Sequence, residues 1–168
     1  SISDIFVFYA ILNKIQFRWM AKHTLFRLPI IGWAMTGAGY IAVDRSNKKK
    51  AQQSMFRAAD QIKQGKSVIV FPEGTTGHND GRMIGFKKGG FMLAKKSKAT
   101  IQPITQYGAN EIVPEQAGRM MQRVYPGDVY IYVHEPMAYE DYKHMKIEEL
   151  CAYVRETIEK PLLEHHLK

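Results

Sequence analysis

Short apolar runs alternate along this chain with amphipathic helical stretches, and the alternation decides the fold class. The run Ser67–Phe71 reads Ser-Val-Ile-Val-Phe, which predicts a strand buried on both faces. Residues Asn47–Gln64 carry their apolar side chains on one helical stripe, and Gly65 follows as a C-cap. Strands alternating with helices predict an α/β fold with a mixed, largely parallel sheet flanked by helices.

The remaining elements follow from the same periodicities. Helices are expected over 4–15, 88–98 and 146–163, strands over 16–21, 40–43, 100–106 and 129–134, and short helical turns over 25–38, broken at Pro29 and Gly32. With 168 residues, of which 45% are hydrophobic, the chain has enough apolar material for one core. A single domain over residues 1–168 is therefore expected.

Positive charge is concentrated in the first part of the chain. Residues 1–100 contain 17 Lys and Arg against 5 Asp and Glu, a net charge of +12, whereas residues 101–168 contain 7 against 11, a net charge of −4. The basic part suits an anionic partner. Nucleic acid, anionic lipid headgroups, phosphorylated substrates and acidic carrier proteins all remain open on charge alone.

Two apolar segments are too short or too interrupted to span a membrane. Residues 5–12 are apolar on every side, and residues 28–43 carry no charge but contain Pro29 and three glycines. Each is expected to be buried in the core, with a position against lipid at the membrane interface as the alternative. The lone cysteine, Cys151, excludes an intrachain disulfide and fits a reducing compartment or a cytosol-facing site.

A polar loop follows the predicted strand at 67–71. Its first residues place a carboxylate, a glycine and two hydroxyls at the end of a strand, where α/β proteins commonly bind ligands; they are Glu73, Gly74, Thr75 and Thr76. The segment is interpreted either as an ordinary turn, with Thr75 as a helix cap, or as part of a binding site.

Three cations near predicted strand and helix ends could hold an anion. Lys87 and Lys88 precede a Gly pair at the start of a predicted helix, where backbone N–H groups suit a phosphate, although a solvated loop with a glycine hinge also fits. Arg45 follows the predicted strand at 40–43. It is interpreted either as a surface ion pair with Asp44 or Asp60 or as a bidentate phosphate clamp.

These pieces, in this order, resemble the lysophosphatidic acid acyltransferase family (1-acylglycerol-3-phosphate O-acyltransferases of the PlsC type). Four blocks identify that family: N-H-x-x-x-x-D, G-x-x-x-x-x-R, F-P-E-G-T-R and a short apolar V-P-V-type strand. The second block fits Gly39–Arg45, the third Phe71–Thr76 and the fourth Ile101–Ile104, and Ala21–Trp33 resembles the linker between the first two. The resemblance covers Ser1 to about Gly108, with a looser fit over 126–136 and the last helix, and implies the glycerol-3-phosphate acyltransferase type of α/β fold.

The first block is incomplete in the printed chain. Asp4 fits the family's aspartate, and the histidine would stand two positions before Ser1. In that pair the histidine takes a proton from the acceptor hydroxyl, while the carboxylate one turn away holds its tautomer. The resemblance therefore implies a catalytic Asp4, an N-terminal truncation, an inactive fragment and an active longer parent. No substitute is expected among the other histidines considered, which are His23, His78, His134, His165 and His166.

The resemblance also implies roles for the other blocks. Glu73 and Gly74 would shape the acceptor site, with Thr75 beside them, and Arg45 would hold the acceptor phosphate. Thr76 stands where the commonest form of the family has arginine. The missing cation favours a lysophospholipid with a larger headgroup over lysophosphatidic acid, unless Lys87 or Lys88 compensates.

The implied reaction moves a fatty acyl group from acyl-CoA or acyl carrier protein to a lysophospholipid hydroxyl in phospholipid biosynthesis or remodelling. No metal or redox cofactor is implied. The implied partners are the acceptor lipid, the anionic acyl donor and a membrane surface, without nucleic acid, at the cytoplasmic face of a membrane.

A nonenzymatic module that binds RNA or anionic membranes is the alternative function. It explains the basic part of the chain and the lysine clusters at Lys48–Lys50 and at Lys95, Lys96 and Lys98, which are otherwise solvated helix faces. It does not explain a carboxylate directly after a buried strand, and RNA-binding aromatic signatures on neighbouring strands are not visible in the sequence.

Overall fold

The computed structural model describes residues 2–12, 14–44, 46–74, 83–112 and 124–166. The chain divides into two compact units, each with its own sheet. The parallel-sheet unit comprises Lys14–Pro72 and Lys88–Ala99, and the hairpin unit comprises Ser1–Asn13, Glu73–Lys87 and Thr100–Lys168. The expectation of a single domain stays a prediction.

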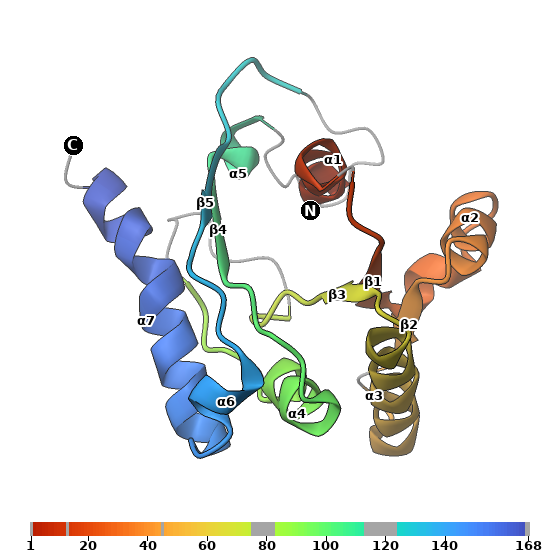
Figure 1. The fold of residues 1–168 in the computed structure, drawn as a ribbon. Helices are drawn as coiled ribbons and strands as arrows, with labels where there is room; N and C mark the ends of the chain where they lie inside the picture. Colours follow the sequence, from red (N-terminus) through yellow and green to blue (C-terminus); the bar gives the residue numbers. More distant parts are fainter. Residues whose placement is uncertain (1, 13, 45, 75–82, 113–123, 167–168) are drawn as a thin grey trace. The chain divides into compact units, whose positions relative to one another are not determined.

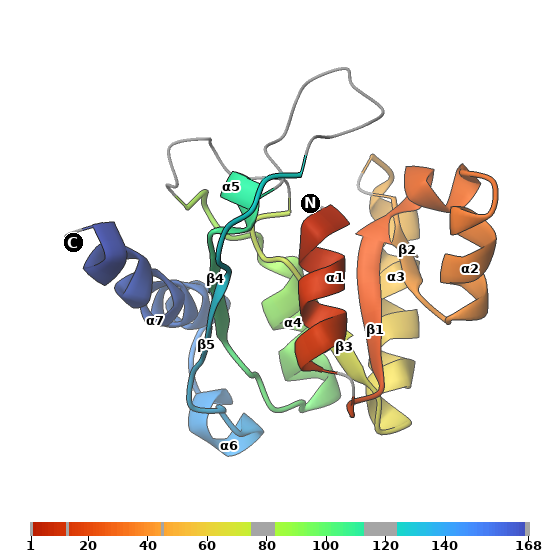
Figure 2. The same ribbon diagram turned by 90° about the horizontal axis from the view of Figure 1, so that it is seen from above.

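Three parallel strands in the order β2-β1-β3 form the sheet of the parallel-sheet unit. Its elements are β1 (Phe17–Lys22), the 3-10 helix η1 (His23–Arg27), α2 (Ile31–Gly37), β2 (Ile41–Val43), α3 (Lys48–Lys63), β3 (Ser67–Ile69) and α4 (Gly89–Ser97). Figures 1 and 2 show α3 running beside these strands. Because the strands are parallel, their carboxyl ends lie at one edge of the sheet, and the loops that follow β2 and β3 begin there.

The core of this unit lies between one face of the sheet and the helices α3 and α4. Buried Ile41, Ala58, Ala59 and Leu93 form its centre, and four partly buried hydrophobic residues pack around them, namely Met20, Met55, Ile62 and Val68. On the other face the ring of Trp19 stacks on Phe71, with ring centroids 5.5 Å apart. The apolar stripe predicted for the helix at 47–64 therefore faces the sheet.

Local capping explains where α3 begins and ends. The side chain of Asn47 accepts a hydrogen bond from the backbone N–H of Lys50 at 3.0 Å, which caps the first turn. At the other end the backbone N–H of Lys66 donates to the carbonyl of Gln61, and Gly65 adopts a positive φ of 79°. This is a Schellman ending, as expected from Gly65 in the sequence.

The hairpin unit is built on two antiparallel strands and the C-terminal helix. Its elements are α1 (Ile2–Ile11), β4 (Ile104–Tyr107), α5 (Ala109–Ile112), β5 (Tyr130–Val133), α6 (Tyr139–Tyr142) and α7 (Ile147–His166). Strand β4 pairs with β5, with Ile104 opposite Val133, and α7 packs on β4. Buried Tyr142, Leu150 and Val154 provide much of the core.

The α/β class with a parallel sheet flanked by helices is confirmed, but the strands form two sheets instead of one. The strand predicted at 67–71 is shorter and lies at a sheet edge. None of the five residues is fully buried, and Phe71 is 41% exposed, so the prediction of burial on both faces is wrong. Gly32 lies inside α2 and does not break it. None of the helices that the structure describes has the length and apolarity needed to cross a bilayer.

Candidate active site

The loop after β3 is closed by the carboxylate of Glu73. Its Oε2 accepts a hydrogen bond from the backbone N–H of Ile84 at 2.8 Å. The preceding residue, Met83, accepts a weaker hydrogen bond at 3.4 Å through its carbonyl from the guanidinium of Arg155 on α7. Glu73 therefore joins the two ends of the loop that carries the predicted acceptor-site residues.

Gly74 meets a backbone requirement of the same loop. Its φ is 76°, in the left-handed region that glycine enters freely and that other residues enter at a cost. The Glu-Gly pair thus combines a carboxylate that fixes the loop with a residue that can make its first bend. This geometry agrees with the expected shaping role but does not test it.

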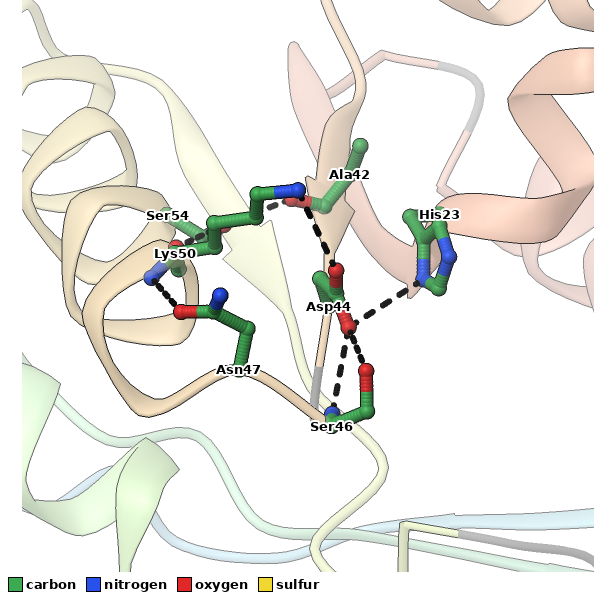
Figure 3. Close-up of polar contacts among 7 residues, drawn as sticks. All are labelled: His23, Ala42, Asp44, Ser46, Asn47, Lys50 and Ser54. Carbon is green, nitrogen blue, oxygen red and sulfur yellow. Dashed lines mark hydrogen bonds and ion pairs between the residues drawn. The ribbon is translucent and has the colours of Figure 1, made fainter.

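A second carboxylate, Asp44, fixes the turn between β2 and α3 (Figure 3). Its Oδ1 accepts hydrogen bonds from the backbone N–H of Ser46 at 3.1 Å and from the Ser46 hydroxyl at 2.6 Å. Two cationic or potentially cationic groups lie near it: His23 Nδ1 at 3.7 Å and Lys50 Nζ at 3.8 Å. The turn is therefore held by three contacts of Asp44: with His23 of η1, with Ser46 in the turn itself and with Lys50 in the first turn of α3.

These contacts lower the pKa of Asp44 below its usual 3.8. The hydrogen bond from the Ser46 hydroxyl is the largest cause, and the charges of His23 and Lys50 add to it, whereas burial acts in the opposite direction. Asp44 thus stays ionised at neutral pH. The hydroxyl of Ser54 donates to the carbonyl of Ala42 at 2.6 Å, which fastens α3 to β2 just before the turn.

Lys87 and Lys88 stand at the start of α4, as predicted. Lys87 is exposed, and Lys88 is the residue that precedes the helix. The Gly pair after them serves close packing: a Cβ on Gly89 would lie 3.0 Å from the side chain of Met55, and one on Gly90 would lie 3.1 Å from Val70. The structure thus gives the glycines a packing role, while phosphate binding stays a prediction.

The structure locates the other predicted site residues only in part. Asp4 lies in α1, and its side chain is outside what the structure describes. Arg45, Thr75 and Thr76 are outside the described residues, so their predicted roles stay predictions. No group of three or more His, Cys, Asp or Glu that could hold a metal ion occurs within the described ranges.

His134 belongs to a structural network of the hairpin unit. Its Nε2 lies 2.8 Å from the hydroxyl oxygen of buried Thr105, and the Thr105 hydroxyl donates to the carbonyl of Ile158 on α7 at 2.7 Å. The Thr105 proton is used in that second bond, so His134 donates through Nε2. Burial lowers the pKa of His134, which favours the neutral ring.

Comparison with known proteins identifies the family. A family model described as Acyltransferase matches residues 1–106, which is more than half of the chain. The chain therefore belongs to the acyltransferase family. The matched range contains the second, third and fourth sequence blocks, Asp4 of the first block, and the two loops described above.

Similar proteins support the same family. The chloroplast 1-acyl-sn-glycerol-3-phosphate acyltransferase LPAT1 of Arabidopsis thaliana is 33% identical over 143 residues, which cover 85% of this chain and 38% of that protein. The enzyme of the same name from Saccharomyces cerevisiae is 30% identical over 140 residues, covering 82% and 45%. This chain thus spans less than half the length of these curated relatives.

A solved structure gives the same relationship in three dimensions. The crystal structure of the 1-acyl-sn-glycerophosphate acyltransferase PlsC from Thermotoga maritima matches with a TM-score of 0.73 and 28% identity. The match covers 90% of this chain and 57% of that chain. The expected fold of the PlsC type is therefore confirmed.

The contacts around Asp44 were missed in the sequence, which offered this residue only as an ion-pair partner for Arg45. One signal was present: an Asp two residues before a Ser commonly accepts from the backbone and hydroxyl of that Ser in a turn. The approach of His23 had no local signal, because 21 positions separate it from Asp44.

Proposed function

We propose that this chain is the catalytic core of an O-acyltransferase that esterifies the free hydroxyl of a lysophospholipid, with lysophosphatidic acid as the first candidate acceptor. The observation that carries the proposal is the family match over residues 1–106, which includes the Glu73-Gly74 turn. The names of the relatives support the choice of acceptor.

The proposed reaction joins the acceptor hydroxyl oxygen to the acyl carbonyl carbon and breaks the carbon–sulfur bond of the thioester. A histidine two positions before Ser1 takes the hydroxyl proton and passes it to the departing sulfur, while Asp4 holds that histidine in the required tautomer. In this proposal the chain that includes the histidine is the active enzyme.

Binding of the anionic substrates falls to the basic part of the chain. Arg45 holds the acceptor phosphate, and Glu73 and Gly74 fix the loop whose residues Thr75 and Thr76 line the acceptor. The donor is acyl-CoA or acyl carrier protein, both anionic, and no metal or redox cofactor takes part. The reaction takes place at the cytoplasmic face of a membrane, where the acceptor lipid lies.

Thiol release measures this function directly. The extended chain is mixed with acyl-CoA or acyl-acyl carrier protein in detergent, with lysophosphatidic acid or lysophosphatidylcholine as acceptor, and free thiol is followed. Acceptor-dependent release is expected from the extended chain. If no acceptor gives release while the protein still binds RNA or anionic vesicles, the nonenzymatic alternative replaces the proposal.

Two arginine variants test the phosphate clamp. Arg45→Ala is expected to raise the KM for lysophosphatidic acid about 10- to 100-fold, the range for losing hydrogen bonds to a charged group, with little change in the donor KM. The matched control is Arg57→Ala, an exposed arginine of α3, which is expected to leave both constants unchanged. An equal rise in the two KM values for Arg45→Ala would contradict the role.

One histidine variant tests the origin of the base. His23 is the described histidine nearest a carboxylate, with its Nδ1 3.7 Å from Asp44. If the printed chain releases thiol, His23→Gln decides whether this residue supplies the base. Loss of that release would overturn the assignment of the base to the position before Ser1.

A further inference from the structure

Five large apolar side chains are exposed within nine residues of η1 and α2. We refer to these five exposed side chains as the η1–α2 apolar patch; they are Leu25, Leu28, Ile30, Ile31 and Trp33. Ile30 is 75% exposed and Trp33 is 76% exposed, so the expectation that residues 28–43 are buried is wrong for this part. Exposed apolar side chains concentrated in this way mark interaction surfaces.

The backbone at Ile30 is held in a conformation that a β-branched residue rarely adopts. Its φ is 64° and its ψ is −59°, and the backbone N–H of Ile31 donates to the carbonyl of Pro29 at 2.7 Å. This is a γ-turn of the rare, strained form. Such a strained backbone persists only where the surrounding structure holds it in place. At Ile30 the strained residue is also one whose side chain is exposed to solvent.

Close packing of η1 against α2 supplies the rigid support. A Cβ on Gly32 would lie 2.2 Å from the carbonyl oxygen of Phe26, so the two backbones touch at a position that only glycine fits. The hydroxyl of Thr36 donates to the carbonyl of Gly32 at 2.7 Å, and Met35 is buried. The η1–α2 apolar patch is therefore carried by two helices whose backbones pack directly against each other.

Cations border the patch, and acidic residues are few. No Asp or Glu occurs between Asp4 and Asp44, whereas Lys22 directly precedes η1, Arg27 is its last residue, and both are exposed. Figure 3 shows how His23, at the start of η1, meets Asp44, which also lies near Lys50 in the first turn of α3. This link brings η1 close to the exposed, lysine-bearing start of α3.

We propose that the η1–α2 apolar patch docks on the headgroup region of an anionic lipid bilayer. Apolar side chains with a tryptophan, bordered by lysine and arginine, match the two attractions that hold proteins at such a surface: burial of apolar area and charge attraction to anionic lipid. The inference deepens the proposed function by locating the lipid contact. Docking can be tested separately from catalysis, because vesicle binding is measured without any acyl transfer.

The chain carries its own reporter for this test, because it has two tryptophans in opposite surroundings. Trp19 is 3% exposed and Trp33 is 76% exposed, so a change in Trp33 emission dominates on docking. The 168-residue chain is titrated with vesicles of phosphatidylcholine alone or mixed with phosphatidylglycerol. A blue shift and quenching by brominated phosphatidylcholine are expected, both stronger with the anionic vesicles.

Matched variants identify the surface responsible. The double variant Ile30→Asn/Ile31→Ser keeps Trp33 and is expected to weaken vesicle binding at least about tenfold, from the area that two apolar side chains bury. Met92→Ser, which changes a 57% exposed side chain of α4, is expected to bind as the unsubstituted chain does. Trp33→Phe is expected to keep co-sedimentation with vesicles but lose the blue shift.

Three outcomes would overturn the proposal. The first is no blue shift of the unsubstituted chain with anionic vesicles, and the second is equal weakening by Met92→Ser and by the double variant. The third is that the unsubstituted chain is a dimer in light scattering while the double variant is a folded monomer. The patch would then be an interface with a second copy of the chain. Thiol release by the extended chain in detergent continues under all three, so failure of docking and failure of the enzymatic proposal are distinguishable.

Discussion

The loops that follow β2 and β3 start at the same edge of one parallel sheet and differ in how they are held. After β2, Asp44 accepts from Ser46 two residues away, and Asn47 caps α3 at once. After β3, the carboxylate of Glu73 accepts from a residue eleven positions later, Ile84. The first loop is a short turn fixed locally, whereas Glu73 joins two positions that are eleven residues apart in the sequence.

A carboxylate at the end of a strand therefore does not by itself identify catalytic chemistry. Asp44 and Glu73 both act here as acceptors that fix backbone. The consequence of losing each one differs, because the long loop carries Thr75 and Thr76 and has the larger conformational entropy to regain. Variants of the two loops test this difference.

The largest effect is expected at Glu73. Glu73→Ala removes the acceptor for the Ile84 N–H and frees the base of the long loop, so thiol release by the extended chain should fall about 100-fold, the cost of misplacing a site by about 1 Å. Glu73→Gln keeps an accepting oxygen and should retain most of the activity. Equal loss in both variants would show that the negative charge itself is required.

The sequence predicted local structure well and long-range contacts poorly. Asn47 and Gly65 mark the ends of α3 because caps depend on neighbouring residues alone. The edge position of β3 depends on strand order, and the exposure of Phe71 depends on what packs beside it; residue spacing encodes neither. The blocks of the candidate site were found by resemblance, but the hydrogen bond from Ile84 to Glu73 was not, since backbone donors leave no residue-type signal.

Gly74→Ala should give the next largest effect. At a φ of 76° an added Cβ costs about 1–2 kcal/mol, and the cost falls on the long loop directly after its carboxylate. Lower thermal stability and lower thiol release are both expected. Gly37→Ala is the matched control, because its φ is not positive and an added Cβ meets nothing within 4 Å. Equal effects of the two substitutions would contradict the requirement for a left-handed residue at position 74.

Asn47→Ala tests the short loop through its helix cap. Loss of the hydrogen bond from the Lys50 N–H should cost about 1 kcal/mol of unfolding free energy in a urea titration. Asn47→Asp keeps an accepting oxygen and should remain within a few tenths of a kcal/mol of the unsubstituted protein. Thiol release by the extended chain should change little in either variant, because the turn is still held by Asp44. A loss of activity as large as that of Glu73→Ala would remove the distinction between the two loops.

Asp44→Asn should give the smallest effect and reveal the charge on the short loop. The asparagine oxygen still accepts from Ser46, so the variant loses the strengthening that the negative charge gives this hydrogen bond and, in smaller part, the attraction to His23 and Lys50. Both losses are small near solvent, and the Tm should fall by only about two degrees at neutral pH. Because the folded pKa of Asp44 lies below 3.8, the ionised carboxylate stabilises the fold above that pH, and its contribution is lost as the pH falls through the folded pKa. The difference in Tm between Asp44→Asn and the unsubstituted chain should therefore shrink towards zero below that pKa, and a difference independent of pH would show that shape rather than charge holds the turn.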